Sequence, residues 1–426
     1  MHRHSGLPES DGSSEVISRV AVLDTIHGAG LIAERMKARG IESVSLEVYH
    51  SSPDVSAFDL IVAPVHLSPE NPAQKEARRL RKKVVTHHRA VGALLAGERD
   101  FGIFEVTGTR GKTTTSLILA RVLSSRGTVV SHTTRGIEVW RDGKGELLRS
   151  GLSITPANVI LAFDAAKEAG AEDLVCEVSL GGTGAADFGV LTSLAGDYKI
   201  AAGTLWASTA KLQMVSLSKR GAKLVAGEDV GLSADVIFGP GPRGSVWSTG
   251  REIRAGSEKA PLRLGEGFDL DSYSAAISGA SAAALAAGLS LEEIASALAG
   301  FEGLGGRMKE IRTDGILVID NSNSGLRASG VEAALDRAEG GSGGLTLVVG
   351  EEAETVCEGM DIPALIDLLS RRRREIDRLI LVGARLAPFA SSISAEIAPD
   401  LDSGLARART ASNRGDRIIS CVKCFR

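Results

Sequence analysis

The chain has few cysteines, no long hydrophobic run and no excess of basic residues. Four cysteines in 426 residues cannot form a disulfide framework. No apolar run is long enough to span a bilayer, and residues 1–20 begin His-Arg-His and stay polar, unlike a secretory signal. A formal net charge of −4 gives no general attraction to polyanions. We therefore expect a cytoplasmic protein that binds neither nucleic acid nor membrane; the oligomeric state is left open.

Two of the cysteines, Cys421 and Cys424, form a single CxxC pair. A structural zinc site normally requires four ligands, and the sequence contains no second CxxC and no HxxxH to complete one. The pair is therefore either a metal or redox site, or part of a terminal strand and tail that carry two thiols.

Three times along the chain, a β-branched apolar run is followed by a turn and then by a segment with helical spacing. This pattern is typical of parallel α/β layers, and 43% hydrophobic residues suffice for two or three cores. We predict an α/β protein with a Rossmann-like domain over residues 1–98, a central P-loop ATPase domain over 99–303 and a second Rossmann-like domain over 304–426.

The first block is expected to contain a glycine turn at 26–30, strands at 19–23, 44–48, 58–63 and 84–85, and helices at 31–39 and 74–83. The central block begins with a strand at 102–106 and includes the longest helical candidate, 274–287. The third block has strands at 316–319, 345–349 and 379–382.

A glycine-containing loop, residues 107–115, follows an apolar strand and precedes a helical stretch. Glycines let backbone N–H groups converge on phosphate oxygens, and the helix N-terminus adds partial positive charge. Lys112 can then reach the β- and γ-phosphates, and the Thr113 hydroxyl can bind Mg²⁺. Val106 stands where the usual P-loop has its first glycine. The predicted ATP-binding residues are Gly108, Thr109, Arg110, Gly111, Lys112, Thr113 and Thr114.

A P-loop protein is expected to hold its magnesium with an acidic residue at the end of an apolar strand. The segment 173–179 fits this description, and Glu177 is the predicted magnesium ligand. The alternative is a solvated glutamate at the rim of the sheet.

The order of the motifs resembles the Mur ligase superfamily. After the Thr-Gly-Thr-x-Gly-Lys-Thr-Thr loop come Glu-Val-Ser at 177–179, Val-Leu-Thr-Ser-Leu at 190–194, Thr-Ala-Lys at 209–211 and Gly-Arg at 306–307. The resemblance implies a three-domain ligase that uses ATP and one or two Mg²⁺ ions to convert a carboxylate into an acyl phosphate. It implies four catalytic residues: Lys112, Glu177, Lys211 and Arg307.

In this superfamily a lysine at the position of Lys211 reacts with carbon dioxide, and the carbamate holds a second magnesium. The resemblance implies a carbamylated Lys211; the alternative is a plain lysine that contacts phosphate or lies on the surface. The Asp-His pair of the family reads Asp197-Tyr198 here, so the imidazole that would assist this metal is absent.

The resemblance also implies nucleotide contacts outside the P-loop. Arg307 matches the hinge arginine that reaches the γ-phosphate when domains close, and Asp320 matches a residue that contacts nucleotide or substrate. Family members often meet the adenine with His-Asn, whereas this chain has Ser272-Tyr273. We therefore predict that the base stacks on Tyr273.

Four segments, 24–28, 86–92, 320–325 and 419–426, resemble a branch of the superfamily from methanogenic archaea. The resemblance implies a small-molecule nickel tetrapyrrole as substrate, one of whose carbons attacks an activated propionate to close a ring. Such a substrate carries many carboxylates and needs cationic or N–H-donating walls. The candidates are His27, Gly28, His66, His87, His88 and Arg89, with a structural histidine as the alternative at each histidine position.

Two other functions remain open. The first is a Mur-type ligase that adds an amino acid to a carboxylate, as in peptidoglycan or pseudomurein assembly or folate polyglutamylation. The second is a nucleotide-binding regulator that retains the P-loop without ligating anything.

Overall fold

The computed structural model describes residues 19–97, 99–352 and 359–425. The polar segment 1–18 and residue 98, at the first predicted domain boundary, lie outside these ranges. Contacts divide the chain into two compact units. The first holds the described residues up to Leu262 together with Ser274–Ala297, and the second holds Arg263–Tyr273 and the described residues from Leu298 onward.

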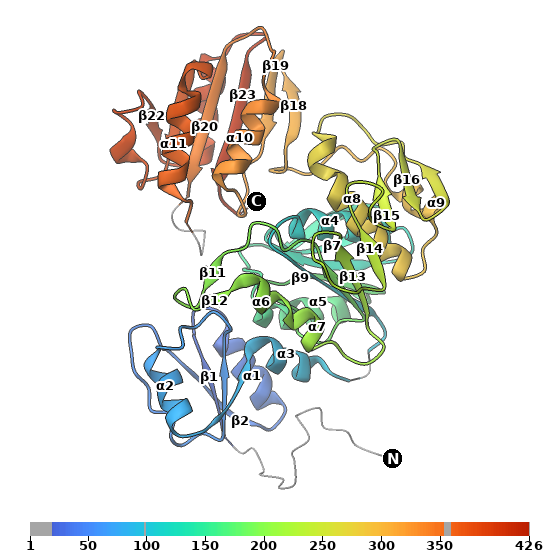
Figure 1. Cartoon of the computed structure of the whole chain (residues 1–426), viewed down its shortest axis with the longest axis vertical. Coiled ribbons are helices and arrows are strands. Elements are labelled where there is room, and N and C mark those ends of the chain that lie inside the picture. Colours follow the sequence, from blue (N-terminus) through green and yellow to red (C-terminus); the bar gives the residue numbers. More distant parts are fainter. Residues whose placement is uncertain (1–18, 98, 353–358, 426) are drawn as a thin grey trace. The chain divides into compact units, whose positions relative to one another are not determined.

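A four-stranded parallel sheet opens the first unit, in the order β2-β1-β3-β4 (Figure 1). Its apolar strands alternate with helices, as the sequence predicts. The helix α3, which the sequence analysis missed, begins directly after β4, where the Thr86 hydroxyl accepts a hydrogen bond from the Arg89 N–H. The elements are β1 (Arg19–Leu23), α1 (Ala29–Ala38), β2 (Glu42–Leu46), β3 (Leu60–Ala63), α2 (Pro72–Arg79), β4 (Lys83–Thr86) and α3 (His87–Leu95).

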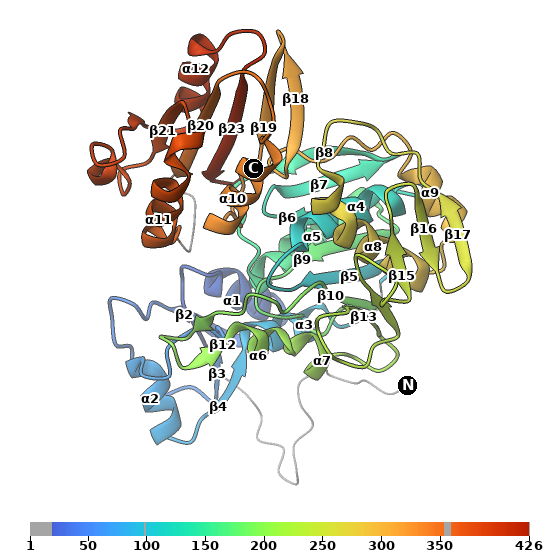
Figure 2. The same cartoon turned by 45° about the horizontal axis from the view of Figure 1, so that its top comes forward.

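An eleven-stranded sheet forms the rest of the first unit, in the order β17-β16-β15-β14-β13-β10-β5-β9-β6-β7-β8 (Figure 2). Its centre is parallel and buried, and antiparallel strands complete both edges. The strands are β5 (Gly102–Thr107), β6 (Val129–Thr133), β7 (Gly136–Arg141), β8 (Lys144–Arg149), β9 (Asp173–Glu177), β10 (Phe188–Leu191), β13 (Lys223–Gly227), β14 (Val236–Phe238), β15 (Val246–Ser248), β16 (Glu252–Ala255) and β17 (Glu258–Pro261).

Helices and one small hairpin complete this part of the chain. Across the described residues, no helix combines the length and apolar character needed to cross a membrane. The elements are α4 (Lys112–Leu123), η1 (Pro156–Asn158), α5 (Val159–Ala169), β11 (Lys199–Ile200), β12 (Leu205–Trp206), α6 (Ala207–Lys211), α7 (Gln213–Ser216), α8 (Leu270–Ala286) and α9 (Leu291–Ala297).

The two sheets of the first unit share a hydrophobic core. Met36 of α1 and Leu94 of α3 belong to the same buried cluster as Ile160 and Phe163 of α5. The turn before α1 also approaches η1, so that helices α1 and α3 connect the small sheet to the large one. The N-terminal sheet is therefore held against the central sheet by apolar packing.

The second unit contains a six-stranded sheet in the order β18-β19-β23-β20-β21-β22, parallel except for β18. These parallel sheets confirm the predicted α/β class. The elements are β18 (Lys309–Thr313), β19 (Ile316–Asp320), α10 (Ala328–Arg337), β20 (Leu345–Glu351), α11 (Ile362–Arg372), η2 (Arg373–Glu375), β21 (Arg378–Val382), η3 (Ala387–Phe389), β22 (Glu396–Ala398), α12 (Leu401–Ala411) and β23 (Arg417–Lys423).

The CxxC pair lies in and just after the central strand β23. Cys421 packs in the core on one face of the sheet, whereas Cys424 packs in the core on the other face. Side chains alternate along a strand, so two residues three positions apart point to opposite faces. Burial also raises the pKa of the Cys421 thiol above its ordinary value. This arrangement favours the strand-and-tail interpretation over a shared metal or redox site.

Candidate active site

The phosphate-binding loop connects β5 to α4. Gly108 and Gly111 have φ angles of 147° and 76°, which L side chains rarely adopt, and Gly111 is the N-cap of α4. A Cβ on Gly108 would lie 2.1 Å from the Thr192 hydroxyl oxygen. That hydroxyl donates to the Arg110 carbonyl at 2.6 Å, and the Thr109 N–H donates to the Ser193 carbonyl at 2.8 Å. The loop is thus fixed with the N-terminus of α4 open to an anion.

Three of the predicted site residues meet at the ends of β5 and β9. These strands pair in parallel, with Val106 opposite Glu177. The Thr113 hydroxyl donates to Glu177 Oε2 at 2.8 Å, and Lys112 Nζ lies 3.9 Å from Glu177 Oε1. Because Glu177 is buried, the solvated-rim alternative is wrong. A threonine hydroxyl and a carboxylate are oxygen donors of the kind Mg²⁺ prefers, so these residues fit the implied ion.

Lys211 is the last residue of α6 and is buried, which excludes the surface-lysine alternative. Its Nζ lies 5.7 Å from the centre of the Tyr198 ring, a cation–π contact at the place where the family resemblance implies a histidine. The neighbouring Asp197 accepts hydrogen bonds from the Ser208 N–H and hydroxyl. Burial acts to raise the pKa of Asp197, but these hydrogen bonds and the Lys211 charge lower it below its ordinary value.

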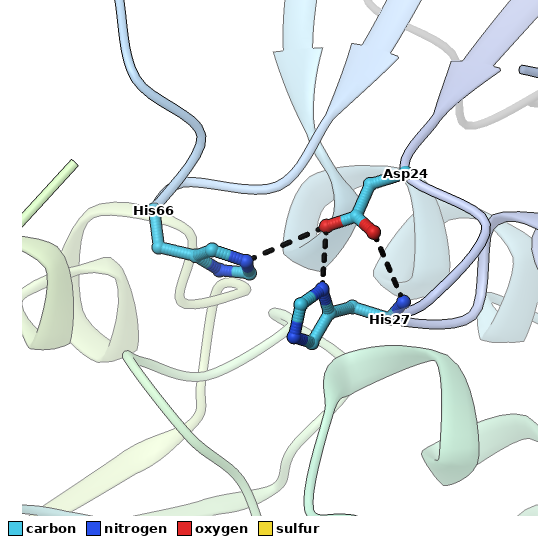
Figure 3. Close-up of side chains that lie close together, drawn as sticks. All are labelled: Asp24, His27 and His66. Carbon is cyan, nitrogen blue, oxygen red and sulfur yellow. Dashed lines mark hydrogen bonds and ion pairs between the residues drawn. The ribbon is translucent and has the colours of Figure 1, made fainter. Parts of the chain in front are cut away.

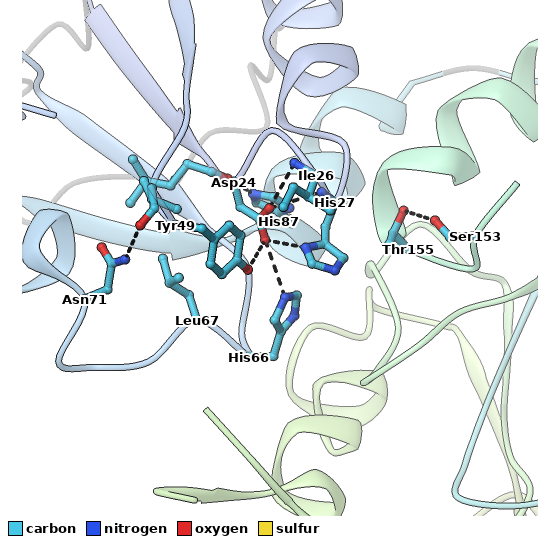
Figure 4. A network of polar contacts seen from close by, with 12 residues as sticks. Asp24, Ile26, His27, Tyr49, His66, Leu67, Asn71, His87, Ser153 and Thr155 are labelled. Atoms are coloured by element: carbon cyan, nitrogen blue, oxygen red, sulfur yellow. Dashed lines mark hydrogen bonds and ion pairs between the residues drawn. The ribbon is translucent and has the colours of Figure 1, made fainter. Parts of the chain in front are cut away.

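A second polar cluster surrounds Asp24, the residue that directly follows β1 (Figures 3 and 4). Asp24 is fully buried with a φ of 80°. Its Oδ1 accepts the N–H groups of Ile26 and His27 at 3.1 Å each. Its Oδ2 accepts from His27 Nδ1 at 2.6 Å and from the Tyr49 hydroxyl at 2.8 Å, with His66 Nε2 at 3.4 Å. The turn after β1 therefore holds a fully hydrogen-bonded carboxylate.

These contacts fix the charge of Asp24. Burial alone would raise the pKa of this carboxyl group, but the hydrogen bonds from His27 and Tyr49 and the contact with His66 outweigh burial and lower the pKa well below its usual range. Asp24 is therefore ionised near neutral pH. His27 and His66 are candidates from the sequence, whereas Asp24 and Tyr49 are not, although an acidic residue directly after a strand is a signal for a site residue.

His87 and His88 begin α3 and link the Asp24 turn to the Glu177 strand. His87 Nε2 donates to the carbonyl of Leu23 at 2.9 Å, and His88 Nε2 donates to the carbonyl of Ser179 at 2.7 Å. Burial lowers the pKa of His87 to about 3 and that of His88 to about 4, so both rings are neutral near pH 7. Both are buried, which favours the structural interpretation offered above as the alternative to substrate binding.

Arg89 lies apart from the histidine cluster. It lines a cavity of about 310 Å³ between α1, α3 and the loop that follows β9, with Met36, Leu60, Thr183 and Leu217 among the other wall residues. None of the cluster residues lines this cavity. The sequence grouped Arg89 with the histidines because they are adjacent in the chain, but successive helix residues point in different directions.

Backbone conformation and close packing both require glycine at position 28. Its φ is 97°, and a Cβ at this position would lie 2.4 Å from the Cβ of Ala157 in η1. We expect Gly28→Ala to destabilise the first unit, since a left-handed residue costs about 1–2 kcal/mol and overpacking about 1–3 kcal/mol. Thermal unfolding should show a Tm several degrees lower. Gly30→Ala is the control because nothing lies within 4 Å of a Cβ there; equal Tm values for the two variants would contradict this.

Arg307 and Asp320 belong to the second unit. Asp320 is buried and accepts the Gly306 N–H at 2.9 Å, while Asn323 donates to the Gly306 carbonyl at 2.9 Å. A Cβ on Gly306, whose φ is 71°, would lie 2.2 Å from the Ser322 carbonyl oxygen. Asp320 and Asn323 therefore brace the loop that carries Arg307.

The structure does not support adenine stacking on Tyr273. This side chain is 1% exposed, and its ring packs edge-on against Phe268 and Phe301. The Leu304 N–H donates to its hydroxyl at 2.8 Å. A base needs an exposed ring face, which Tyr273 lacks, so this prediction requires correction: Tyr273 anchors the segment that leads to Arg307. Burial also raises the pKa of its hydroxyl above the ordinary range.

Comparisons with known proteins show which family and fold this chain shares. Residues 310–424 match the family model described as the C-terminal domain of coenzyme F430 synthetase CfbE. A coenzyme F430 synthetase from Methanosarcina acetivorans is 35% identical over 96% of this chain and 99% of its own length. A bifunctional folylpolyglutamate synthase/dihydrofolate synthase from Yersinia pestis is similar in structure, with a TM-score of 0.60 and 19% identity over 80% of this chain and 90% of that chain.

A pseudomurein peptide ligase type C from Methanothermus fervidus matches 95% of this chain and 96% of its own, with a TM-score of 0.54 and 15% identity. The fold and the P-loop site define an ATP-dependent ligase of the Mur type, and the three-domain architecture implied by the motifs is confirmed. Within that class, the chain belongs to the coenzyme F430 synthetase family. The resemblance to a branch of the superfamily from methanogenic archaea is therefore also confirmed.

Proposed function

We propose that the chain phosphorylates a propionate of a nickel tetrapyrrole, 15,17(3)-seco-F430-17(3)-acid, and closes its carbocyclic ring to give coenzyme F430, ADP and phosphate. One observation carries the proposal: a P-loop lysine and threonine meet a buried glutamate in a chain that matches a coenzyme F430 synthetase along almost its whole length. Transfer of a phosphoryl group to a carboxylate requires positioning and charge stabilisation more than a protein nucleophile.

The residues of the P-loop would bind ATP. Residues 108–114 would line the phosphate site with backbone N–H groups other than that of Thr109, which donates to the Ser193 carbonyl, and Lys112 would balance charge that develops on the transferred group. Thr113 and Glu177 would hold Mg²⁺, which when bound neutralises phosphate charge. A structurally similar bifunctional folylpolyglutamate synthase/dihydrofolate synthase was solved with Mn, AMPPNP and L-glutamate bound, which supports the use of ATP and a divalent ion.

Lys211 is the proposed site of carbamylation. The reaction needs a neutral amine, and burial disfavours the ammonium form. The carbamate would supply oxygen donors for a second Mg²⁺ where Tyr198 cannot supply an imidazole. Arg307 and Asp320 are proposed to contact the nucleotide from the C-terminal domain, over residues 304–426, after closure onto the central domain, over residues 99–303.

The N-terminal domain, over residues 1–98, is proposed to bind the macrocycle. His27, His66 and Arg89 are the candidates whose side chains are not fully buried. His27 and His66 lie in the cluster around Asp24, whereas Arg89 lines the separate cavity beside α3. Gly28, His87 and His88 are proposed to support the chain around His27.

Arg89→Ala is expected to raise the KM for the tetrapyrrole roughly 10-fold or more, because a hydrogen bond to a charged group contributes about 1.5–3 kcal/mol. The KM for ATP should stay unchanged. Lys83→Ala removes an exposed cation from the preceding strand and serves as the control. Unchanged steady-state kinetics for Arg89→Ala would remove this residue from the substrate site.

The function is tested by incubating the purified protein with the seco acid, ATP and Mg²⁺ and following the absorption spectrum of the nickel chromophore. We expect a spectral change that requires ATP and is matched by stoichiometric release of phosphate. Parallel reactions contain amino acids as acceptors. Phosphate release that depends on an amino acid, with no change in the chromophore, would replace the proposal with an amide ligase.

A further inference from the structure

The proposed ring closure needs a base that removes a proton from carbon. The amide-forming relatives have no such step. An amine attacks an acyl phosphate through a nitrogen lone pair, whereas a carbon of the macrocycle must first lose a proton. A protein group within reach of that C–H bond makes this step faster by general-base catalysis. The following inference therefore rests on the proposed ring closure.

We propose that His27 is the general base for the carbon nucleophile and that Asp24 positions it. The ionised carboxylate of Asp24 can only accept, so the 2.6 Å contact places a proton on His27 Nδ1. In a neutral ring, Nε2 then carries the lone pair. This is the relation between carboxylate and imidazole in a catalytic triad, where the acid fixes the tautomer and stabilises the imidazolium.

Hydrogen bonds to both carboxylate oxygens fix the position of Asp24, as a positioning residue requires. Two backbone N–H groups occupy Oδ1, and the Tyr49 hydroxyl shares Oδ2 with His27. The carboxylate is 0% exposed while the His27 side chain is 23% exposed. The ring can therefore meet a substrate, whereas its carboxylate partner stays in a dry environment where the charge interaction is strong.

A metal ion explains this geometry less well. The donor atoms of Asp24, His27 and His66 all lie within 4.8 Å of one another. Two ligands of one tetrahedral ion, at ordinary bond lengths, are about 3.3 Å apart. The separation between Asp24 Oδ2 and His27 Nδ1 is 2.6 Å, which is a hydrogen-bond distance.

Short contacts link the His27–Asp24 pair, here called the dyad, to the segment that carries Glu177. His87 contacts the carbonyl of Leu23, next to Asp24, and His88 contacts the carbonyl of Ser179, two residues beyond Glu177. The His27 ring also lies towards the segment that carries Ser153 and Thr155 (Figure 4), and a Cβ on Gly28 would lie 3.9 Å from the Thr155 hydroxyl. A substrate bound there would have one end near the base and the other towards the phosphate site.

The chemical step balances without a further reagent. His27 Nε2 takes the proton as the C–H bond breaks, and the electron pair stays on carbon. This carbon attacks the acyl phosphate, the new C–C bond forms, and the C–O bond to phosphate breaks. Phosphate leaves with its electron pair, and the proton passes from the imidazolium to solvent.

The test separates phosphorylation from ring closure. Hydroxylamine traps an acyl phosphate as a hydroxamate, whether or not the carbon nucleophile is available. With saturating tetrapyrrole and ATP, we expect His27→Gln and Asp24→Asn to slow formation of the cyclic ketone at least about 10²-fold more than they slow formation of the hydroxamate. A substrate deuterated at the attacking carbon should show a larger kinetic isotope effect in these variants.

His50→Gln is the matched control, since this histidine is exposed in the same domain and lies outside the dyad. Ring closure by His27→Gln at the wild-type rate would overturn the proposal, and so would equal losses of hydroxamate and ketone in His27→Gln. If the wild-type protein forms no hydroxamate, this result would instead contradict the acyl phosphate intermediate of the proposed function. The Tm of the Asp24→Asn protein shows whether this variant folds. If it does not fold, the result for His27→Gln alone decides the test.

Discussion

Lys112→Ala is expected to reduce acceptor-dependent phosphate release by at least about 10²–10³-fold, the usual cost of removing one group that stabilises transition-state charge. Lys112 is the first residue of α4, and its Nζ lies 3.9 Å from the carboxylate of Glu177. The measurement is steady-state phosphate release with and without the tetrapyrrole.

Lys144→Ala is the control for this loss, because Lys144 is an exposed cation on the edge strand β8. Near-normal turnover by Lys112→Ala would contradict a catalytic P-loop. The wild-type protein also tests the regulator alternative: ATP binding without acceptor-dependent phosphate release would favour a nucleotide-binding regulator.

Glu177→Gln should cause a loss of similar size through the metal site. The amide keeps the size of the side chain and can still accept the Thr113 hydroxyl, but it removes the negative charge that a hard divalent cation requires. We expect the Mg²⁺ concentration for half-maximal activity to rise, together with a lower kcat. Titration of activity against Mg²⁺ measures both.

Glu172→Gln provides the matched control, since it makes the same chemical change in an exposed residue just before β9. A Glu177→Gln enzyme with an unchanged Mg²⁺ titration would show that this carboxylate does not bind the ion. Glu177 would then serve only to hold Thr113 and Lys112 in place.

Individual strands and the glycine loop could be predicted from the sequence because the residues that specify each of them are close together in the chain. The predicted strand 19–23 is β1 residue for residue, and Glu177 is the last residue of its strand as expected. A glycine loop between an apolar strand and a helix specifies its own conformation. Parallel pairing then brings two strand ends together, which places Glu177 beside Thr113.

Contacts between distant segments could not be read in the same way. Tyr49 follows β2 and His66 follows β3, and neither residue signals that it will lie beside Asp24. The burial of Tyr273 depends on Phe268 and Phe301, which pack around it from separate turns. Helix α3 was missed because His87, His88 and Arg89 were considered only as candidate substrate contacts and not as the start of a helix.

Strand β23 determines when the second unit can fold. It lies between β19 and β20, which pair with it and not with each other. Synthesis must therefore proceed beyond Lys423 before the two halves of this sheet can join. Until then, β19 and β20 each leave an apolar edge unpaired, so a chain truncated before β23 should aggregate more readily than a chain that includes this strand.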